Sequence, residues 1–310
     1  MEQTIKTKKN KNKKNPNHMS VGAAICIYGP VILFMLLCLL PFIMVVSTSF
    51  SQSKLIEEYG VSLFPRGWSL DAYKTIFIYP DEILNAYKNS LIITVIGTIC
   101  NVVLCIMAAY PLSKLDFKFR SVLSLTLFLS TAFSAGIVPQ YILYKNYLHI
   151  YNTWWVLILP QMGNVGHVIF LRVFFQAIDA PFYEAARIEG ANEFTIMWKI
   201  AVPLVAPGIA TVAFYSVLMY WNDATSALYF LDTSSSYMPI SVYITRMSQL
   251  IVFLREVQAG VYQGISLGDM EIPEYTLQTA IVVVTTAPML CVFTFFQKYF
   301  VRGLTTGGVK

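Results

Sequence analysis

One stretch of the sequence matches a motif for covalent catalysis. Gly264, Ser266 and Gly268 fit the G-x-S-x-G pattern, which in hydrolases places a nucleophilic serine between a strand and a helix. Here a glycine-rich stretch surrounds Ser266, with neither a strand pattern nor Asp and His partners. We interpret the match as chance, so a membrane enzyme is a distant alternative that depends on Ser266. No G-x-x-x-x-G-K-[ST] loop occurs, so the chain itself does not hydrolyse ATP.

The cysteines and histidines predict neither a metal site nor a cofactor. All five cysteines lie in apolar stretches, which excludes a disulfide framework and gives no metal-ligand spacing. His18, His149 and His167 are far apart in the sequence, and we interpret them as ordinary loop or bundle residues.

A cluster of aromatic and polar residues offers binding chemistry instead. It consists of Tyr215, Ser216, Tyr220, Trp221, Asn222 and Asp223. Aromatic rings stack on the apolar face of a sugar while amides and carboxylates bond its hydroxyls, so the mixture suits a glycan better than a lipid. The alternative is an interfacial Tyr and Trp belt with a solvated Asp, because Asp223 lies roughly 30 Å along a helix from Pro203. Tyr215 and Ser216 are deeper and are candidates to line a path.

The composition is that of a membrane protein. Hydrophobic residues make up 56% of the 310 positions and charged residues 13%, with a mean hydropathy of +0.59. Soluble domains hold about 45–50% apolar and 25% charged residues, so the chain lies outside their range. Its length is enough for one bundle of about six spans and leaves little for a soluble domain.

We predict an all-α integral membrane fold with six transmembrane helices. The expected spans are residues 21–50, 90–112, 121–144, 153–175, 203–231 and 276–296. Gly136 and Pro139 should interrupt the third span, and the Pro and Gly residues within 160–166 the fourth. Such breaks are either packing kinks or parts of a path. Residues 51–84 and 232–275 are expected to be external loops.

The polar segment between the fourth and fifth spans, residues 181–207, has the pattern of two short helices. Asp179 can cap the first helix, and Gly190 supplies a left-handed stop. Asn192 can cap the second helix, which should run to Pro203. Each helix has only about nine residues and is marginal alone, so the segment needs a partner surface.

This segment resembles the EAA loop of ABC importer permeases. The resemblance is carried by Glu184, Ala185, Ala186, Gly190, Ile200 and Pro203, with Glu189 where the family usually has Asp. In that family the loop is a cytoplasmic coupling helix that docks into an ATPase subunit. The resemblance implies that Glu184 contacts a basic or hydroxyl group, that Ala185 and Ala186 allow close approach and that Gly190 sets the bend. The alternative is an amphipathic connector.

Other stretches are similar to MalG-like sugar permeases: the end of the first span, residues 41–51, the loop at 64–73 and the tail at 297–310. The resemblance implies a type I ABC importer permease for a sugar or oligosaccharide, with complex oligosaccharides as one group. Implied partners are two ATPase subunits, a second and different six-span permease, and an extracellular sugar-binding protein met by the loop at 248–274. No cofactor is implied.

Two alternatives to a carbohydrate permease remain. One is a permease for another class of imported substrate. The other is a stand-alone secondary transporter, which would be expected to carry paired ionisable residues deep in its spans. The predicted spans are almost free of such residues.

The basic residues predict the orientation. Residues 1–20 form a basic tail ahead of the permease domain at 21–310, and with six spans the tail side holds 15 of the 22 Lys and Arg residues, the other side 7. Cytoplasmic loops carry the excess, which puts both termini and the segment 181–207 in the cytoplasm of a bacterial plasma membrane. No aromatic residue interleaves with the tail, so we expect it to lie near anionic lipid headgroups rather than on nucleic acid.

Overall fold

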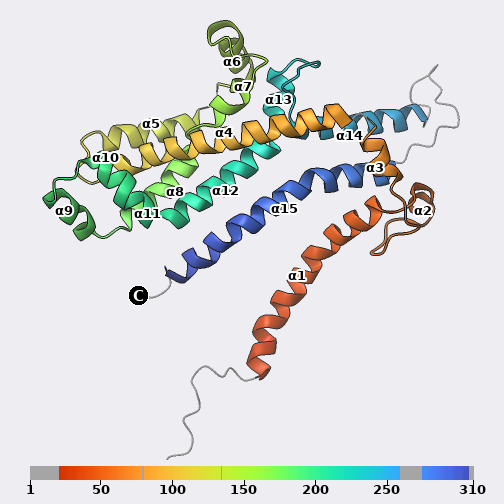
Figure 1. The fold of residues 1–310 in the computed structure, drawn as a ribbon, viewed down its shortest axis with the longest axis horizontal. Coiled ribbons are helices and arrows are strands. Elements are labelled where there is room, and N and C mark those ends of the chain that lie inside the picture. The colour runs from red at the N-terminus through yellow and green to blue at the C-terminus, as the bar shows by residue number, and fades with distance from the viewer. Residues whose placement is uncertain (1–20, 79, 134, 259–273, 307–310) are drawn as a thin grey trace, which may run out of the picture.

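The computed structural model describes residues 21–78, 80–133, 135–258 and 274–306 (Figure 1). Within these ranges every regular element is a helix, and a single antiparallel bridge joins Ser51 to Trp68. The predicted all-α class is therefore confirmed. The predicted G-x-S-x-G stretch and much of the expected loop at 248–274 lie outside the described residues.

Three helices are each long and apolar enough to cross a membrane. They are α1 (Val21–Ser49), α4 (Pro80–Ser113) and α15 (Glu274–Thr306). Helix α4 begins before the predicted residue 90, because Asp81 and Glu82 sit in its first turn and complement the positive end of the helix. The polar residues ahead of position 90 therefore extend the helix beyond the apolar run.

The other three spans are pairs of helices that meet at a bend. Helix α5 (Arg120–Ala132) meets α6 (Ile137–Ile142) and η1 (Leu143–Tyr147) at 110°, and α7 (Trp155–Ile158) with η2 (Leu159–Gln161) meets α8 (Val165–Gln176) at 47°. The predicted breaks in the third and fourth spans are thus confirmed, and Gly136 and Gly163 both have positive φ there. Counting each bent pair as one gives up to six spans by length and composition.

The third bent pair changes the predicted fifth span. Helices α10 (Glu193–Ile196), η3 (Met197–Ala201) and α11 (Val202–Leu204) meet α12 (Ala206–Asn222) at 83°. The predicted fifth span at 203–231 therefore contains more than one helix. The straight helix holds 17 residues, about 25 Å, and a separate helix, α13 (Thr225–Phe230), follows it.

The remaining helices lie at the ends of the bundle. They are α2 (Ser53–Tyr59), α3 (Asp71–Ile76), α9 (Ala180–Ile188) and α14 (Ile240–Gln258). Helix α14 corrects the prediction that 232–275 is a loop. Buried Ile240 and Ile251 pack it against α4 and α15, so this tertiary packing covers part of the apolar surface of the helix.

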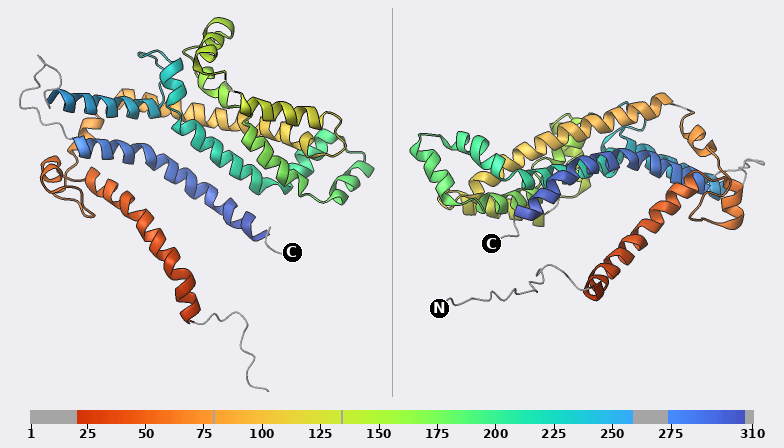
Figure 2. Two further views of the ribbon diagram at one scale, coloured as in Figure 1. Left: turned by 180° about the vertical axis from the view of Figure 1, so that it is seen from behind. Right: turned by 60° about the horizontal axis from the view of Figure 1, so that its bottom comes forward.

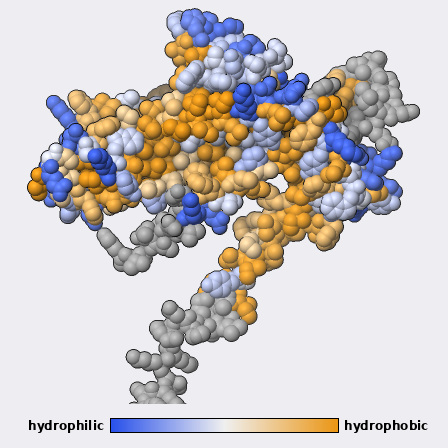
Figure 3. Space-filling model, in the orientation of Figure 1, coloured by the Kyte–Doolittle hydropathy of each residue, from blue (hydrophilic) through white to orange (hydrophobic). Residues whose placement is uncertain are grey.

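Helix α4 is at the centre of the bundle and packs against both α8 and α12. Helix α15 packs against α12 on one side and against α1 on the other (Figure 2). Close approach depends on small residues: a Cβ at Gly208 of α12 would lie 2.7 Å from the Phe174 ring of α8. Figure 3 shows apolar residues over the bundle and along α1, with hydrophilic residues at the end formed by α9 and α10 and at the end near α2.

Candidate functional site

Helix α9 forms one end of the bundle and is amphipathic. It buries Tyr183 and Ala186 against the rest of the chain, whereas Glu184 and Ala185 are exposed and Ile188 is 87% exposed. Ala186 therefore belongs to the core of this chain, and a partner would approach the backbone over Ala185. Glu184 makes no hydrogen bond or ion pair within the described part of the chain.

The turn after α9 is fixed by its backbone. Gly190 has φ of +81°, which confirms the predicted left-handed stop. The Gly190 N–H donates to the Arg187 carbonyl and the Ala191 N–H to the Ala186 carbonyl, both at 3.0 Å, which is the Schellman arrangement. Because the two bonds close the helix end, the direction of the chain after α9 is set by Gly190.

The predicted caps have different outcomes. Asn192 Oδ1 accepts a 2.8 Å hydrogen bond from the Thr195 N–H at the start of α10, as predicted. Asp179 occupies the N-cap position of α9, but its side chain makes no capping bond. The second helix continues to Leu204 and widens into a π-helix at Met197–Ala201, just ahead of Pro203, which has no N–H to donate.

A groove of about 370 Å³ runs along the exposed side of α9. It is lined by Pro181, Phe182, Ala185, Ala186, Glu189 and Ile200. Three of the predicted coupling residues, Ala185, Ala186 and Ile200, thus meet on one surface. Phe182 is 52% exposed at this groove, which leaves apolar area available for a partner.

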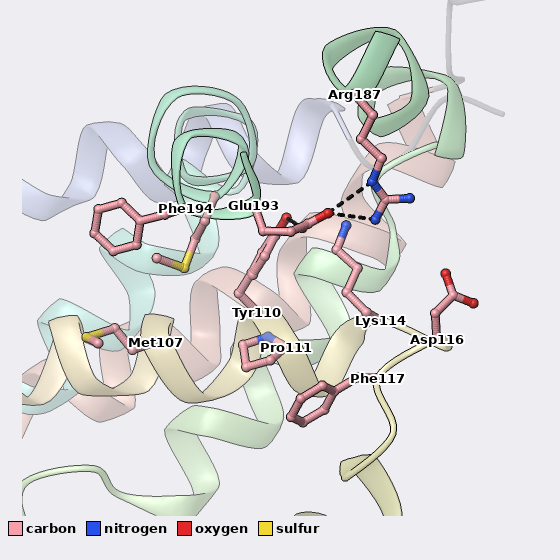
Figure 4. Close-up of a pocket in the computed structure, with 10 residues that line it drawn as sticks. Met107, Tyr110, Pro111, Lys114, Asp116, Phe117, Arg187, Glu193 and Phe194 are labelled. Atoms are coloured by element: carbon pink, nitrogen blue, oxygen red, sulfur yellow. Dashed lines mark hydrogen bonds and ion pairs between the residues drawn. The ribbon is translucent and has the colours of Figure 1, made fainter. Parts of the chain in front are cut away.

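A cluster of charged residues joins this segment to the end of α4 (Figure 4). The Tyr110 hydroxyl of α4 donates a 2.8 Å hydrogen bond to Glu193 Oε2. Glu193 Oε1 accepts from Arg187 at 3.0 Å (Nε) and pairs with its Nη2 at 2.8 Å. Burial acts to raise the pKa of Glu193, but the bonds from Tyr110 and Arg187 outweigh it and hold that pKa below its ordinary value.

Lys114 makes a second connection in the same place. Its Nζ lies 2.8 Å from the centroid of the Tyr183 ring and 4.8 Å from that of Tyr110. Burial lowers the pKa of the Lys114 ammonium from 10.5 to about 8, and the nearby Glu193 carboxylate opposes the shift without cancelling it. Lys114 therefore still carries its charge at neutral pH.

The six residues predicted for a substrate path differ in how exposed they are. Ser216, Tyr220 and Trp221 are buried at 0%, 3% and 4% exposure and take part in packing. The Tyr220 hydroxyl donates to the Ile158 carbonyl at 3.1 Å, and Trp221 Nε1 to the Thr285 carbonyl at 3.3 Å. Tyr215, by contrast, is 56% exposed and Asn222 is exposed, so these two are available to a ligand.

A buried amide holds the break in the fourth span. Asn101 of α4 is fully buried, and its Nδ2 donates to Ser216 Oγ at 2.7 Å and lies 3.0 Å from His167 Nδ1. Its Oδ1 accepts from the Asn164 N–H at 3.1 Å and from Cys105 Sγ at 3.4 Å. Asn101 thus satisfies the N–H of Asn164, the N-cap residue of α8, and joins α4, α8 and α12.

This break brings two further polar residues to the outer part of α12. Gln161 Nε2 donates to Asp223 Oδ2, and Asn164 Nδ2 lies 4.0 Å from Met219 Sδ. Asn164 is exposed, and Gln161 and Asp223 are partly exposed. The exposed polar surface therefore includes residues of both the fourth and the fifth spans.

Sequence reasoning missed most of the connecting residues. Tyr110 and Glu193 are 83 positions apart, so no local pattern joins them. The sequence shows a basic turn that begins at Lys114 and an acidic residue, Glu193, after Asn192. It gives no indication that these two stretches lie close together. Gln161 was not predicted, and Asn164 was expected only as a residue within the break of the fourth span. Polar residues at a break in a membrane span were the one available signal for them.

A family model described as "Binding-protein-dependent transport system inner membrane component" matches residues 89–306. The chain is 36% identical over 284 residues to the polygalacturonan/rhamnogalacturonan transport system permease protein YtcP of Bacillus subtilis (strain 168), covering 92% of this chain and 96% of that protein. It is 33% identical over 272 residues to protein LplC of the same organism, covering 88% and 89%.

A solved structure also resembles this chain in fold. A crystal structure of a bacterial ABC transporter involved in the import of the acidic polysaccharide alginate contains a chain that matches with a TM-score of 0.76 and 28% identity, over 91% of this chain and 99% of that one. The predicted resemblance and the interpretation as a permease rather than an enzyme are confirmed by these relationships. The chain belongs to the binding-protein-dependent transport system inner membrane component family and is a permease subunit of an ABC importer.

Proposed function

We propose that this permease imports a carbohydrate, and specifically an oligosaccharide. The relatives named for polygalacturonan, rhamnogalacturonan and alginate support this class of cargo. The exposed Tyr215 ring and the amides of Asn164 and Asn222 suit a chain of sugar rings, because a ring face and a set of hydroxyls need both kinds of contact.

The path is proposed to run along the exposed surface formed by Tyr215, Asn222, Asp223, Gln161 and Asn164. A single chain leaves this surface open on one side, so a second permease subunit would close it. An extracellular sugar-binding protein, in keeping with the name of the family, would deliver the cargo at the end near Asp223.

Helix α9 is proposed to be the coupling helix for an ATPase subunit. The observation that carries this proposal is the groove beside Ala185, an exposed apolar surface at the end of the bundle whose position is fixed by the Schellman turn at Gly190. The excess of basic residues supports a cytoplasmic location for α9 and both termini. Glu184, which has no partner of its own in the described chain, would contact a basic or hydroxyl group on the ATPase.

The proposed mechanism is alternating access. ATP binding closes two partner ATPase subunits, which displace the two copies of the coupling helix, one in each permease. The spans then reorient and the path opens to the other side. This chain contributes the path and the coupling helix, and the free energy comes from hydrolysis in the partners.

Gly190→Val tests the coupling role in the complete reconstituted importer. Valine at φ of +81° is strained, so the direction of the chain after α9 should change and both sugar uptake and sugar-stimulated ATP hydrolysis should collapse. Glu184→Lys should have the same effect by reversing the charge. Gly60→Val is the matched control, because Gly60 also has a positive φ, +73°, and open space around it, but lies away from α9. Normal sugar uptake by both the Gly190→Val and the Glu184→Lys variants would contradict the coupling role of α9.

A further inference from the structure

We propose that five residues clamp the end of α4 to the polar segment at residues 181–207, called the coupling segment below, so that α4 and α9 move as one body during transport. The clamp consists of Tyr110, Lys114, Tyr183, Arg187 and Glu193. This inference rests on the proposed coupling role of α9 and goes beyond it by naming positioning residues that carry displacement into the bundle.

The first joint of the clamp is hydrogen-bonded. One carboxylate oxygen of Glu193 in α10 accepts a hydrogen bond from the Tyr110 hydroxyl, and the other accepts from the Arg187 guanidinium. One carboxylate therefore connects three elements: α4, α9 and α10. Tyr110 is only 5% exposed, and an edge contact with Phe175 of α8, at 5.7 Å between ring centroids, restricts its ring.

The second joint is the ammonium of Lys114 on the face of Tyr183. Lys114 directly follows the end of α4, and Tyr183 is 8% exposed on the buried side of α9. The Tyr183 hydroxyl also reaches the Phe175 carbonyl at 3.4 Å. Because the two joints lie on different turns of α9, they oppose rotation of α9 as well as its translation away from α4.

The clamp supplies a rigid route that the chain itself lacks. Along the chain, α9 is followed by the turn at Gly190, and the second helix of the segment is separated from α12 by an 83° bend. Helix α4, by contrast, is continuous over 34 residues and carries Asn101, which holds the break in the fourth span. A displacement of α9 can therefore reach the proposed path through α4.

Specific contacts act together with apolar packing at this junction, because Tyr110, Tyr183 and Ala186 also belong to one buried hydrophobic cluster. A cavity of about 490 Å³ lies beside the clamp, between α4 and α10, and its walls include Met107, Pro111, Phe117, Phe194 and Met197 (Figure 4). Because this side of the junction is open, no side chain there can replace the clamp contacts, and their loss should loosen the junction on this side.

Two conservative variants test the clamp in the complete importer. Tyr110→Phe removes only the hydroxyl of the first joint, and Lys114→Met removes only the charge of the second. The double variant should lower sugar uptake per ATP hydrolysed by about tenfold, since a typical coupling free energy corresponds to 5–150-fold. Lys118→Met, an exposed lysine in the same turn, is the matched control and should leave this ratio unchanged.

Cross-linking provides a readout that a merely structural role would not give. Met107→Cys of α4 and Phe194→Cys of α10, in a chain whose native cysteines are replaced by alanine, place two thiols on the walls of the cavity beside the clamp. If α4 and the coupling segment move as one body, a short bis-maleimide between these thiols should leave uptake intact. Uptake abolished by the cross-link would show relative motion and overturn the clamp.

The outcomes separate the clamp from the coupling role itself. If the double variant transports with a normal ratio while Gly190→Val does not, the clamp is wrong and the coupling role of α9 stands. If both variants transport normally, the coupling role fails as well. A lowered ratio in the double variant together with a tolerated cross-link supports the clamp.

Discussion

The ring of Tyr220 on α12 lies directly against the backbone of Gly97 on α4. A Cβ built at Gly97 would come within 2.6 Å of Tyr220 Cζ, well inside van der Waals contact. The ring has little freedom to move away, because its hydroxyl donates to the Ile158 carbonyl at 3.1 Å. The absence of a side chain at position 97 therefore sets how closely the two central helices approach.

Gly97→Ala should consequently destabilise the folded permease. Overpacking of this kind costs about 1–3 kcal/mol, which would appear as a lower unfolding temperature of the purified protein in detergent. Gly29→Ala is the control, because a Cβ at Gly29 in α1 meets nothing within 4 Å. Equal unfolding temperatures for the Gly97→Ala variant and the parent protein would contradict the packing described for α4 and α12.

Asn101→Leu should weaken the junction of α4, α8 and α12. It leaves the Asn164 N–H without its partner and removes the bond to Ser216, at a cost of about 1–2 kcal/mol for polar groups within a membrane bundle. A double-mutant cycle with Ser216→Ala, measured by reversible denaturation, should show that the two changes are not additive. Strict additivity would mean that the Asn101 amide contributes nothing through Ser216.

The chemical reactivity of Lys114 should depend on pH in an unusual range. Burial lowers its pKa to about 8, so the neutral amine, which is the form that reacts with acylating reagents, accumulates as the pH rises through about 8. The unfolded chain keeps its proton up to the ordinary value of 10.5, so this group makes the folded state relatively more stable as the pH rises between the two values.

Pulse acetylation followed by mass spectrometry measures this directly. Lys114 in the assembled importer should show a labelling midpoint near pH 8, and in the denatured chain a midpoint near 10.5. Identical profiles in the folded and denatured protein would mean that the ammonium is as well hydrated as in the free chain, and the burial at the end of α4 would be wrong.

The predicted path residues should separate into two groups by function. Trp221 is buried and bonded to α15, so Trp221→Ala should cost about 3–5 kcal/mol in stability and reduce the amount of folded protein. Tyr215 is 56% exposed, so Tyr215→Ala should leave the unfolding temperature unchanged and lower sugar uptake several-fold. A Tyr215→Ala protein with normal uptake of every oligosaccharide tested would exclude Tyr215 from the path.

Local signals allowed much of the architecture to be predicted from the sequence. The apolar runs of α1 and α15 are long enough to define spans, and the Gly and Pro residues around Gly163 mark a break. The turn at Gly190 and the cap at Asn192 follow from the conformational preferences of single residues. Each of these features is decided within a few positions of the chain.

The remainder depends on tertiary contacts. Whether an aromatic ring beside the membrane surface is buried, like Tyr220, or exposed, like Tyr215, is decided by what packs against it, and residue type alone does not reveal this. The prediction placed α14 in a loop, and the packing of this helix against α4 and α15 joins stretches that are far apart in the sequence. The bond from Tyr110 to Glu193 joins two stretches that the sequence offers no reason to pair.

A single cysteine at Ala185 tests the coupling role of α9 most directly. In cells that express the complete importer, with the native cysteines of this chain replaced by alanine, Ala185→Cys lies in the exposed groove of α9. A thiol cross-linker should join this cysteine to an ATPase subunit, and a membrane-impermeant maleimide added to intact cells should not label it. Labelling from outside, or an active importer in which no cross-link to the ATPase forms, would contradict the coupling role.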